Sequence, residues 1–249
     1  MPPLLIIKRH QPEPAGKAIR IRKQEIKRLK YATIKEHINQ DETLAKSLLA
    51  SRTWPWEVLP LIHDYILQVG PTLPSEEYEQ REAGVWIARS AKIWPTVSIT
   101  GPCIVGKNAE LRQCAFIRGN AIIGEHAVVG NSTELKNVIL FNYVEAPHYN
   151  YVGDSILGFH AHMGAGSITS NIKSDRKNIV IKGEDGTIET GMRKIGAMLG
   201  DWTEIGCGSV LNTGSIIGAH TNIYPLSSIR GIIPPDSIYK REGEIVPKR

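Results

Sequence analysis

Residues 118–171 include most of the side chains in this chain that could carry out chemistry together. Among them are Arg118, Lys136 and His148. An imidazole titrates near neutral pH and can act as a general base. A guanidinium group binds phosphate through a planar fork of donors, and an ammonium group binds it as a point charge. These residue types therefore suit proton abstraction next to a bound phosphate.

A six-residue repeat indicates the structure that must position these side chains. Aliphatic residues recur at every sixth position, and small residues lie four positions after them. This period matches neither a helix nor a simple strand, but it fits a coil with three short sides whose aliphatic residues point inward. Such coils must stack, because one coil cannot bury its own interior. We predict an all-β solenoid, a left-handed parallel β-helix of hexapeptide repeats. The aliphatic series is Ile87, Ile93, Ile99, Val105, Leu111, Ile117, Ile123, Val129 and Leu135.

The repeat weakens in the part of the sequence that contains His148. It stumbles between about 141 and 156, resumes at Leu157, and breaks again for a polar excursion near 172–193. The excursion is predicted to be a β-hairpin that turns at the Gly-Glu-Asp-Gly sequence of residues 183–186. A solenoid loses its hexads where residues are needed for something other than stacking, so the interruption predicts the position of a site.

The remaining sequence divides the chain into four parts. Residues 1–30 are expected to form a flexible basic tail. Residues 31–85 are expected to hold one or two helices, packed against or capping the first coil, and then a linker. The β-helix is predicted over residues 86–241, and residues 242–249 are predicted to be a C-terminal tail.

Composition and charge bear on the function classes. The chain has 249 residues and a net charge of +5, and residues 1–30 carry nine of the 30 lysines and arginines but only two acidic residues. A basic arm could bind RNA in a salt-dependent way. This arm has no interleaved aromatic residues and no recognition motif, so we favour a solvated tail over a nucleic-acid site.

The sequence predicts a cytoplasmic protein. No apolar run approaches the length that spans a bilayer, and the N-terminus lacks the apolar region of a secretory signal. The three cysteines form no CxxC pair, which favours free thiols in a reducing compartment.

The stretch from 118 to 171 closely resembles one known family. This is the acetyltransferase domain of the bifunctional enzyme N-acetylglucosamine-1-phosphate uridyltransferase/glucosamine-1-phosphate N-acetyltransferase, and the resemblance extends over roughly residues 86–241. It implies a CoA-dependent N-acetyltransferase that acts on an amino-sugar phosphate such as glucosamine 1-phosphate, with acetyl-CoA as co-substrate, in UDP-N-acetylglucosamine biosynthesis. It also implies a homotrimer with sites between the prisms. The matching residues are Arg118, Gly130, Asn131, Glu134, Lys136, His148, Tyr151, Gly153, Asp154, Gly164, Ala165, Gly166, Ile168, Thr169 and Asn171.

The resemblance implies roles for residues at the acceptor side. His148 corresponds to the general base, and Glu134 to a carboxylate that orients its imidazole. Arg118, Lys136 and Tyr151 correspond to residues that contact the sugar phosphate.

The resemblance also implies a set of CoA contacts. Ala165 and Asn171 match CoA-contacting positions, and Cys207, Pro225 and Arg241 align with further ones. Cys207 stands where the family has a serine and Pro225 where it has an alanine, so of these later three only Arg241 keeps the family's residue type.

Three departures separate this chain from the family. No glycine-rich phosphate loop precedes residue 86, so uridyltransferase activity is not expected. His162 replaces a sugar-binding asparagine and Ile172 replaces a tyrosine, which leaves the acceptor open. The excursion is longer than in the common bacterial enzyme and resembles archaeal-type sugar-phosphate nucleotidyltransferases. Lys177 matches a substrate-binding lysine by position, and Lys194 competes for that role.

Two alternatives remain from the residues themselves. His148, His160 and His162 could suggest a metal, but no carboxylate lies at a telling spacing, and no metal site is predicted. The changes at His162 and Ile172 also suit a non-catalytic trimeric β-helix that binds a sugar nucleotide or a partner protein.

Overall fold

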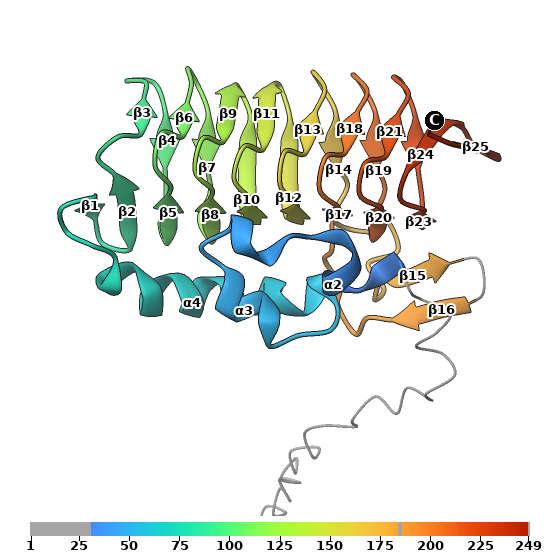
Figure 1. Cartoon of the computed structure of the whole chain (residues 1–249), viewed down its shortest axis with the longest axis horizontal. Helices are drawn as coiled ribbons and strands as arrows, with labels where there is room; N and C mark the ends of the chain where they lie inside the picture. The colour runs from blue at the N-terminus through green and yellow to red at the C-terminus, as the bar shows by residue number, and fades with distance from the viewer. Residues whose placement is uncertain (1–30, 184–185, 249) are drawn as a thin grey trace, which may run out of the picture.

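The structure, a computed structural model, describes residues 31–183 and 186–248. The basic tail predicted at residues 1–30 lies outside the described residues. Within them, short parallel strands stack into a solenoid of about eight coils, with three strands to a coil (Figure 1). The predicted fold class, a left-handed parallel β-helix, is confirmed.

The coils form a prism with three faces, which we call A, B and C. Strands β10 and β12 each run through a corner and so belong to both C and A. Face A contains β2 (Val85–Ala88), β5 (Cys103–Val105), β8 (Ala121–Ile123), the ends of β10 (Glu134–Leu140) and β12 (Tyr151–Leu157), β17 (Ala197–Leu199), β20 (Ser215–Ile217) and β23 (Ile232–Ile233). Face B contains β3 (Lys92–Ile93), β6 (Glu110–Leu111), β9 (Val128–Asn131), β11 (Glu145–His148), β13 (His162–Met163), β18 (Glu204–Ile205), β21 (Asn222–Ile223) and β24 (Ser237–Arg241). Face C contains β4 (Ser98–Ile99), β7 (Phe116–Ile117), the starts of β10 and β12, β14 (Ile168–Thr169), β19 (Val210–Leu211) and β22 (Ser228–Ile229).

The aliphatic residues of the hexads fill the interior of the prism. Ile87, Val105 and Ile123 occupy one register position on three successive strands, and each is at most 1% exposed. Ile93 and Ile99 are only half-buried, because no coil precedes the first one. The hexads therefore position the coils as the sequence predicted.

The sequence indicated an interruption of the coil between about 141 and 156, and this expectation is wrong. Leu140, Ala146 and Val152 point inward with no exposed surface, so the coil continues without a break. What changes is the length of two corners between C and A, at Lys136–Asn137 and Gly153–Asp154. Val138 follows its partner Ala121 by seventeen residues, whereas eighteen separate Ala121 from its preceding partner Cys103. Each short corner removes one residue and shifts the repeat by one position.

Face A is apolar on both of its sides. The outward residues of its central strands have no exposed surface, which is typical of a sheet covered on both faces. The N-terminal segment supplies the cover, because η3 contacts β12 and α4 contacts β8 and β10. The outward residues are Ile104, Ile122, Ile139, Ile156 and Ile216.

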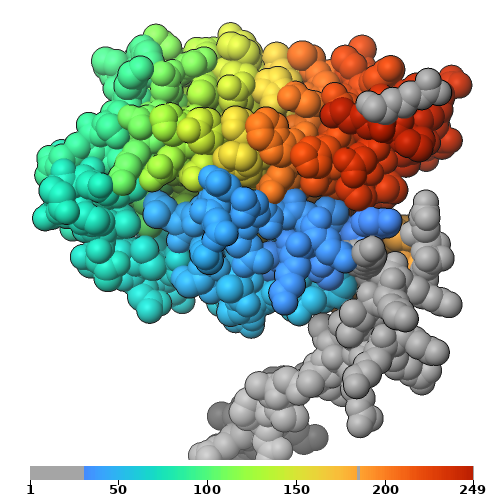
Figure 2. Space-filling view, viewed as in Figure 1, coloured from blue at the N-terminus to red at the C-terminus, as the bar shows by residue number. Residues whose placement is uncertain are grey.

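The helical segment predicted over 31–85 thus extends along face A over several coils, and not over the first coil alone (Figures 1 and 2). Its buried side chains include Trp56, Leu59, Ile62 and Ile66. The elements are α2 (Ile34–His37), η2 (Gln40–Glu42), α3 (Lys46–Ala50), η3 (Pro55–Leu61), α4 (Ile62–Val69) and η4 (Gly70–Thr72).

Both ends of the solenoid carry an antiparallel strand where linker and tail were expected. Strand β1 (Tyr78–Glu82) pairs with β2, and β25 (Glu244–Pro247) pairs with β24. Unpaired strand edges at the ends of a stack would otherwise expose their donors and acceptors. The predicted linker before residue 86 and the predicted tail at 242–249 therefore each contain an ordered strand.

The polar excursion holds the hairpin of β15 (Val180–Gly183) and β16 (Gly186–Glu189). Its apolar residues Ile179 and Ile181 are buried, and β15 contacts β23. Figure 1 places the hairpin on the same side of the prism as the helices. Among the described helices, none combines the length and the apolar character needed to cross a bilayer.

Candidate functional site

The corner between faces B and C carries one exposed residue per coil at the same place on five successive coils. Strand register aligns His148 with Ala165, Ala165 with Cys207, Cys207 with Pro225, and Pro225 with Arg241. All five are exposed. At about 4.8 Å per coil, this B–C column is about 20 Å long. The column contains the predicted general base and four of the five predicted CoA-binding residues.

Backbone hydrogen bonds hold the B–C column in register. The amide of Gly166 donates to the carbonyl of His148, that of Gly208 to Ala165, and that of Leu226 to Cys207, each at 2.9 Å. The five residues are separated by 17, 42, 18 and 16 positions in the sequence, so no single period reveals the column.

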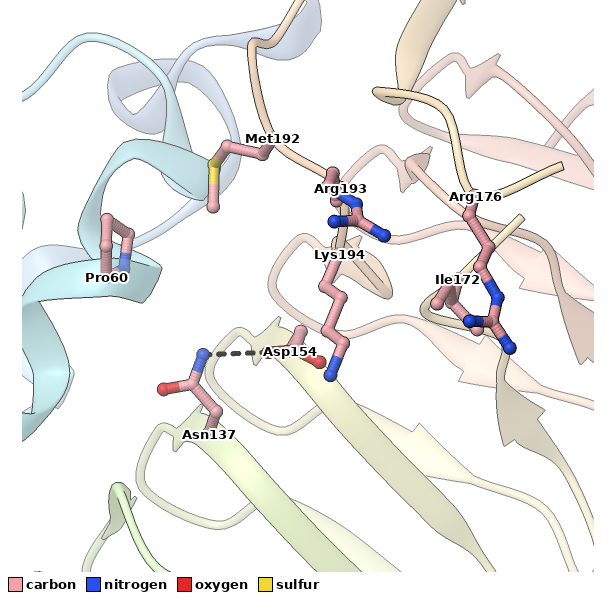
Figure 3. A pocket seen from close by; sticks show the side chains of 8 residues that line it. All are labelled: Pro60, Asn137, Asp154, Ile172, Arg176, Met192, Arg193 and Lys194. Atoms are coloured by element: carbon pink, nitrogen blue, oxygen red, sulfur yellow. Dashed lines mark hydrogen bonds between the residues drawn. The ribbon is translucent and has the colours of Figure 1, made fainter. Parts of the chain in front are cut away.

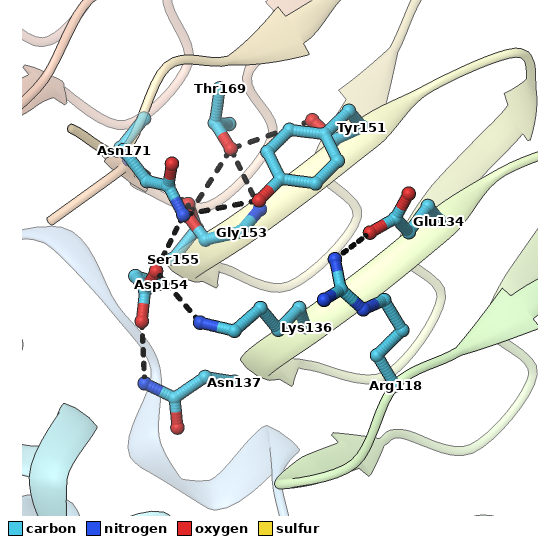
Figure 4. Close-up of polar contacts among 11 residues, drawn as sticks. Arg118, Glu134, Lys136, Asn137, Tyr151, Gly153, Asp154, Ser155, Thr169 and Asn171 are labelled. Carbon is cyan, nitrogen blue, oxygen red and sulfur yellow. Dashed lines mark hydrogen bonds and ion pairs between the residues drawn. The ribbon is translucent and has the colours of Figure 1, made fainter. Parts of the chain in front are cut away.

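The corner between faces C and A carries a polar cluster centred on Asp154 (Figure 4). Asp154 is 5% exposed and has a φ of 48°, a left-handed conformation that aspartate tolerates. Its Oδ1 accepts a hydrogen bond from Asn137 Nδ2 at 2.9 Å, and its Oδ2 accepts one from Asn171 Nδ2 at 2.6 Å. Lys136 Nζ lies 3.5 Å from the same Oδ2. The short corners at Lys136–Asn137 and Gly153–Asp154 place these groups side by side.

Tyr151 joins the cluster through Asn171. Asn171 Nδ2 also donates to Tyr151 Oη at 3.1 Å, so one amide group fixes both the phenol and the carboxylate of Asp154. Burial, with a smaller contribution from the charge of Asp154, raises the pKa of Tyr151 above its usual value. The phenol therefore remains a hydrogen-bond donor across the neutral range.

Arg118 and Glu134 form an ion pair on the outer side of face C, with Arg118 Nη1 2.6 Å from Glu134 Oε1. The resemblance had assigned Glu134 to orient His148. The structure instead pairs Glu134 with Arg118, because strand register sets Glu134 beside Phe116, two residues before Arg118. Within the described residues, the imidazole of His148 has no hydrogen-bond partner.

Two further predicted substrate residues lie apart from the Asp154 cluster. His162 is on the outer side of face B, where its Nδ1 lies 3.0 Å from Glu204 Oε2. Lys177 is exposed in the excursion, and its backbone amide donates to Asp175 Oδ1. Its competitor Lys194 lies at the base of the excursion, where an isolated antiparallel bridge joins it to Ile172.

Lys194 lines a cavity of about 700 Å³ beside the C–A corner (Figure 3). Asn137 and Asp154 also line it, and Arg176 and Arg193 enter it from the excursion. Neither arginine was predicted from the sequence. The only hint in the sequence was that basic residues occur at both ends of the excursion. The bridge at the base of the excursion brings these two ends together.

The candidate metal ligands do not converge. His160 stacks between Tyr143 and Trp202, with ring centroids 4.7 Å and 4.0 Å away. His162 pairs with Glu204, and His148 is in the B–C column. Across the described ranges, no group of three or more histidine, cysteine or acidic side chains could hold a metal ion.

Comparison with known proteins agrees with the resemblance. No protein-family model matches the chain. It is 31% identical over 179 residues to the bifunctional protein GlmU of Methanococcus maripaludis, which covers 64% of this chain and 43% of that protein. It is 32% identical over 147 residues to the bifunctional sugar-1-phosphate nucleotidylyltransferase/acetyltransferase of Sulfurisphaera tokodaii, which covers 52% of this chain and 37% of that protein. The predicted resemblance is confirmed.

The chain spans less than half the length of these two relatives. Among solved structures, a hexapeptide transferase family protein from Anaplasma phagocytophilum is 17% identical and covers 66% of this chain and 80% of that one, with a TM-score of 0.37.

Proposed function

We propose that this chain is a CoA-dependent N-acetyltransferase that acts on a phosphorylated amino sugar. The observation that carries the proposal is the pair of residue columns along the two edges of face C. One edge presents an exposed imidazole at the head of a row of residues that align with CoA positions of the family, and the other presents cations and hydrogen-bond donors around Asp154.

The C–A corner supplies the groups that an acceptor needs. The ammonium of Lys136 and the guanidinium of Arg118 would hold a phosphate. Both are partly exposed and now bound to carboxylates, so a phosphate would exchange with Asp154 or Glu134 as their partner. The Tyr151 phenol would donate to a phosphate or hydroxyl oxygen.

The B–C column supplies the base and the path for the co-substrate. The thioester end of acetyl-CoA would lie near His148, with its pantetheine arm along Ala165, Cys207 and Pro225 toward Arg241. His148 would take a proton as the amino nitrogen attacks the thioester carbonyl. The C–N bond forms, the C–S bond breaks, and the imidazolium returns the proton to the leaving sulfur of CoA.

The same geometry supports a homotrimer. His148 and Lys136 lie at opposite edges of face C, so a site that uses both would take one column from each of two copies. The helices already occupy face A, which leaves faces B and C for contacts between copies. A cyclic trimer closes through heterologous contacts, in which two different surfaces of neighbouring copies meet.

A thiol-release assay with acetyl-CoA and glucosamine 1-phosphate tests the proposal. We expect His148→Ala to lower kcat by about 10²–10⁴-fold, the usual contribution of a general base, while acceptor binding is retained. His220→Ala, another exposed histidine at a corner, is the matched control and should keep full activity. The proposal fails if wild-type protein releases no thiol with any amino-sugar phosphate or nucleotide-linked amino sugar.

One observation favours a second function, a non-catalytic β-helix that binds a sugar nucleotide or a partner protein. Glu134 is paired with Arg118, so in this chain no described carboxylate orients the imidazole of His148. This reading predicts ligand binding that His148→Ala leaves unchanged, with no acetyl transfer.

A further inference from the structure

The cavity beside the C–A corner is lined by cations and apolar side chains that a sugar monophosphate bound at Lys136 would not contact. We propose that it binds the nucleoside diphosphate group of the acceptor, so that the acceptor is an amino sugar linked to a nucleotide. This inference rests on the proposed function, because it identifies the acceptor of that same site.

One end of the cavity gathers three positively charged side chains, whereas a single carboxylate, that of Asp154, lines the same cavity. Arg176, Arg193 and Lys194 are exposed and line the cavity, and none of them forms an ion pair with another described residue. By contrast, Arg118 and Lys136 each lie beside a carboxylate. Two guanidinium forks and an ammonium group match the spread-out oxygens of a diphosphate, which offers more than one anionic centre.

The cationic end is continuous with the acceptor site. Asp154 lines the cavity and also contacts Lys136 in the polar cluster. In Figure 3 the side chain of Lys194 reaches toward Asp154. A phosphate monoester held at Arg118 and Lys136 would leave the three excursion cations without a partner. A diphosphate that begins near Lys136 would extend to them.

The other end of the cavity is apolar and suits a nucleobase. Pro60 of η3 and Met192 line it, opposite the cationic end (Figure 3). Asn137 donates its Nδ2 to Asp154, and its amide oxygen points toward the Pro60 side, where a base N–H could donate to it. The volume of the cavity, about 700 Å³, lies within the usual range of ligand pockets, which runs from about 300 to 1,000 Å³.

The ADP end of CoA carries the same chemistry and is the rival occupant. The residues aligned with CoA positions are mostly in the B–C column, across face C from the cavity. Competition between nucleotides and CoA separates the two sources.

Isothermal titration of the full chain tests the proposal with four probes: UDP-glucosamine, UDP, glucosamine 1-phosphate and CoA. We expect UDP-glucosamine to bind at least about tenfold more tightly than glucosamine 1-phosphate, the affinity gain of one or two extra charged hydrogen bonds. UDP should displace UDP-glucosamine, and CoA should not.

The double variant Arg176→Ala/Arg193→Ala isolates the cavity. It should lower the affinity for UDP-glucosamine about tenfold or more and change that for glucosamine 1-phosphate less than about threefold. Lys194→Gln gives an independent measurement with the same expected direction. Arg52→Ala, at an exposed arginine of the N-terminal segment, is the matched control and should change neither affinity.

Three results would overturn the proposal: equal affinity for the two sugars, equal losses for both in the double variant, or displacement of UDP by CoA. Acetyl transfer to glucosamine 1-phosphate without preference for UDP-glucosamine would contradict this inference and leave the proposed function standing. UDP binding that depends on Arg176 and Arg193, without transfer to any amino sugar, would contradict the proposed function and support the nucleotide site.

Discussion

Faces A and C share the same inward hexads but differ on their outward sides. On face A the outward residues, such as Ile122 and Ile139, have no exposed surface, because the N-terminal helices cover them. On face C the corresponding residues, such as Tyr151 and Ile168, keep exposed surface, with the exposed B–C column along one edge and the polar Asp154 cluster at the other. The interior determines that coils stack, and the outward side determines where the helices dock.

The largest expected effect is a difference in stability between the same substitution, isoleucine to alanine, on the outward sides of faces A and C. Ile139→Ala on face A should destabilise the protein by about 2–5 kcal/mol, because it leaves a cavity under the helices. Ile168→Ala on face C should cost less than about 1 kcal/mol, because its surroundings are partly solvent. Urea unfolding followed by circular dichroism measures both. Equal losses would contradict the difference between the faces.

Acid should weaken the cover of face A specifically. Burial lowers the pKa of His37 to about 4, and its ring nitrogens have no hydrogen-bond partner in the described structure. The unfolded chain takes up a proton below about pH 6.5 and the folded chain does not. The stability that depends on neutral His37 is therefore present above pH 6.5 and is lost as the pH falls toward 4, by about 3 kcal/mol in total.

Unfolding measured between pH 7 and pH 4 checks this effect, with His37→Leu as the comparison. The variant should lose less stability than wild type over that range. Burial raises the pKa of the neighbouring Asp201, which favours the folded state at low pH and partly opposes His37. A variant with an unchanged pH dependence would show that His37 is not the titrating group.

Asp154→Asn tests whether the C–A corner works as one unit. The change keeps the size of the side chain and suits the left-handed backbone, but it removes the charge that Lys136 and the amides of Asn137 and Asn171 contact. We expect the acceptor KM to rise about ten- to hundredfold, and by more than the KM for acetyl-CoA, because Asn137 and Asn171 lose the charged acceptor that positions them and hydrogen bonds to charged groups contribute about 1.5–3 kcal/mol. A change confined to acetyl-CoA would contradict this role.

Lengthening the short corner at Lys136–Asn137 by one residue is expected to have only a small effect on stability. Inserting one glycine between Asn137 and Val138 restores the eighteen-residue coil length that separates Cys103 from Ala121. The fold should persist with a loss of about 1 kcal/mol, the cost of one additional glycine. Acceptor binding should weaken about tenfold, because Asn137 would lose its contact with Asp154. An insertion after Glu242, in the turn before β25, is the control.

The sequence predicted the prism because its inward hexads are a local and repeated signal. Ile87, Val105 and Ile123 occupy the register positions that the period implies. It failed at Leu140 and Val152, because a corner one residue shorter shifts the period without breaking the coil. A fixed period cannot distinguish these two cases.

The candidate site was only partly predictable for the same reason. Family spacing identified Lys136, Tyr151 and Asn171, which the short corners bring to one cluster. It could not find Arg176 and Arg193, because their proximity depends on the Ile172–Lys194 bridge and on the way the hairpin folds back. Long-range closure of a loop leaves no periodic trace in the sequence.

The central claim is that columns on opposite edges of face C, from two copies of the chain, form one acetyl-transfer site. Co-assembly of His148→Ala chains with Lys136→Ala chains tests it most directly. Each variant alone should be nearly inactive. Random mixed oligomers should recover roughly a quarter of the wild-type thiol release, because a cyclic interface then pairs one intact column from each variant. Mixed assemblies no more active than either variant alone would contradict the claim.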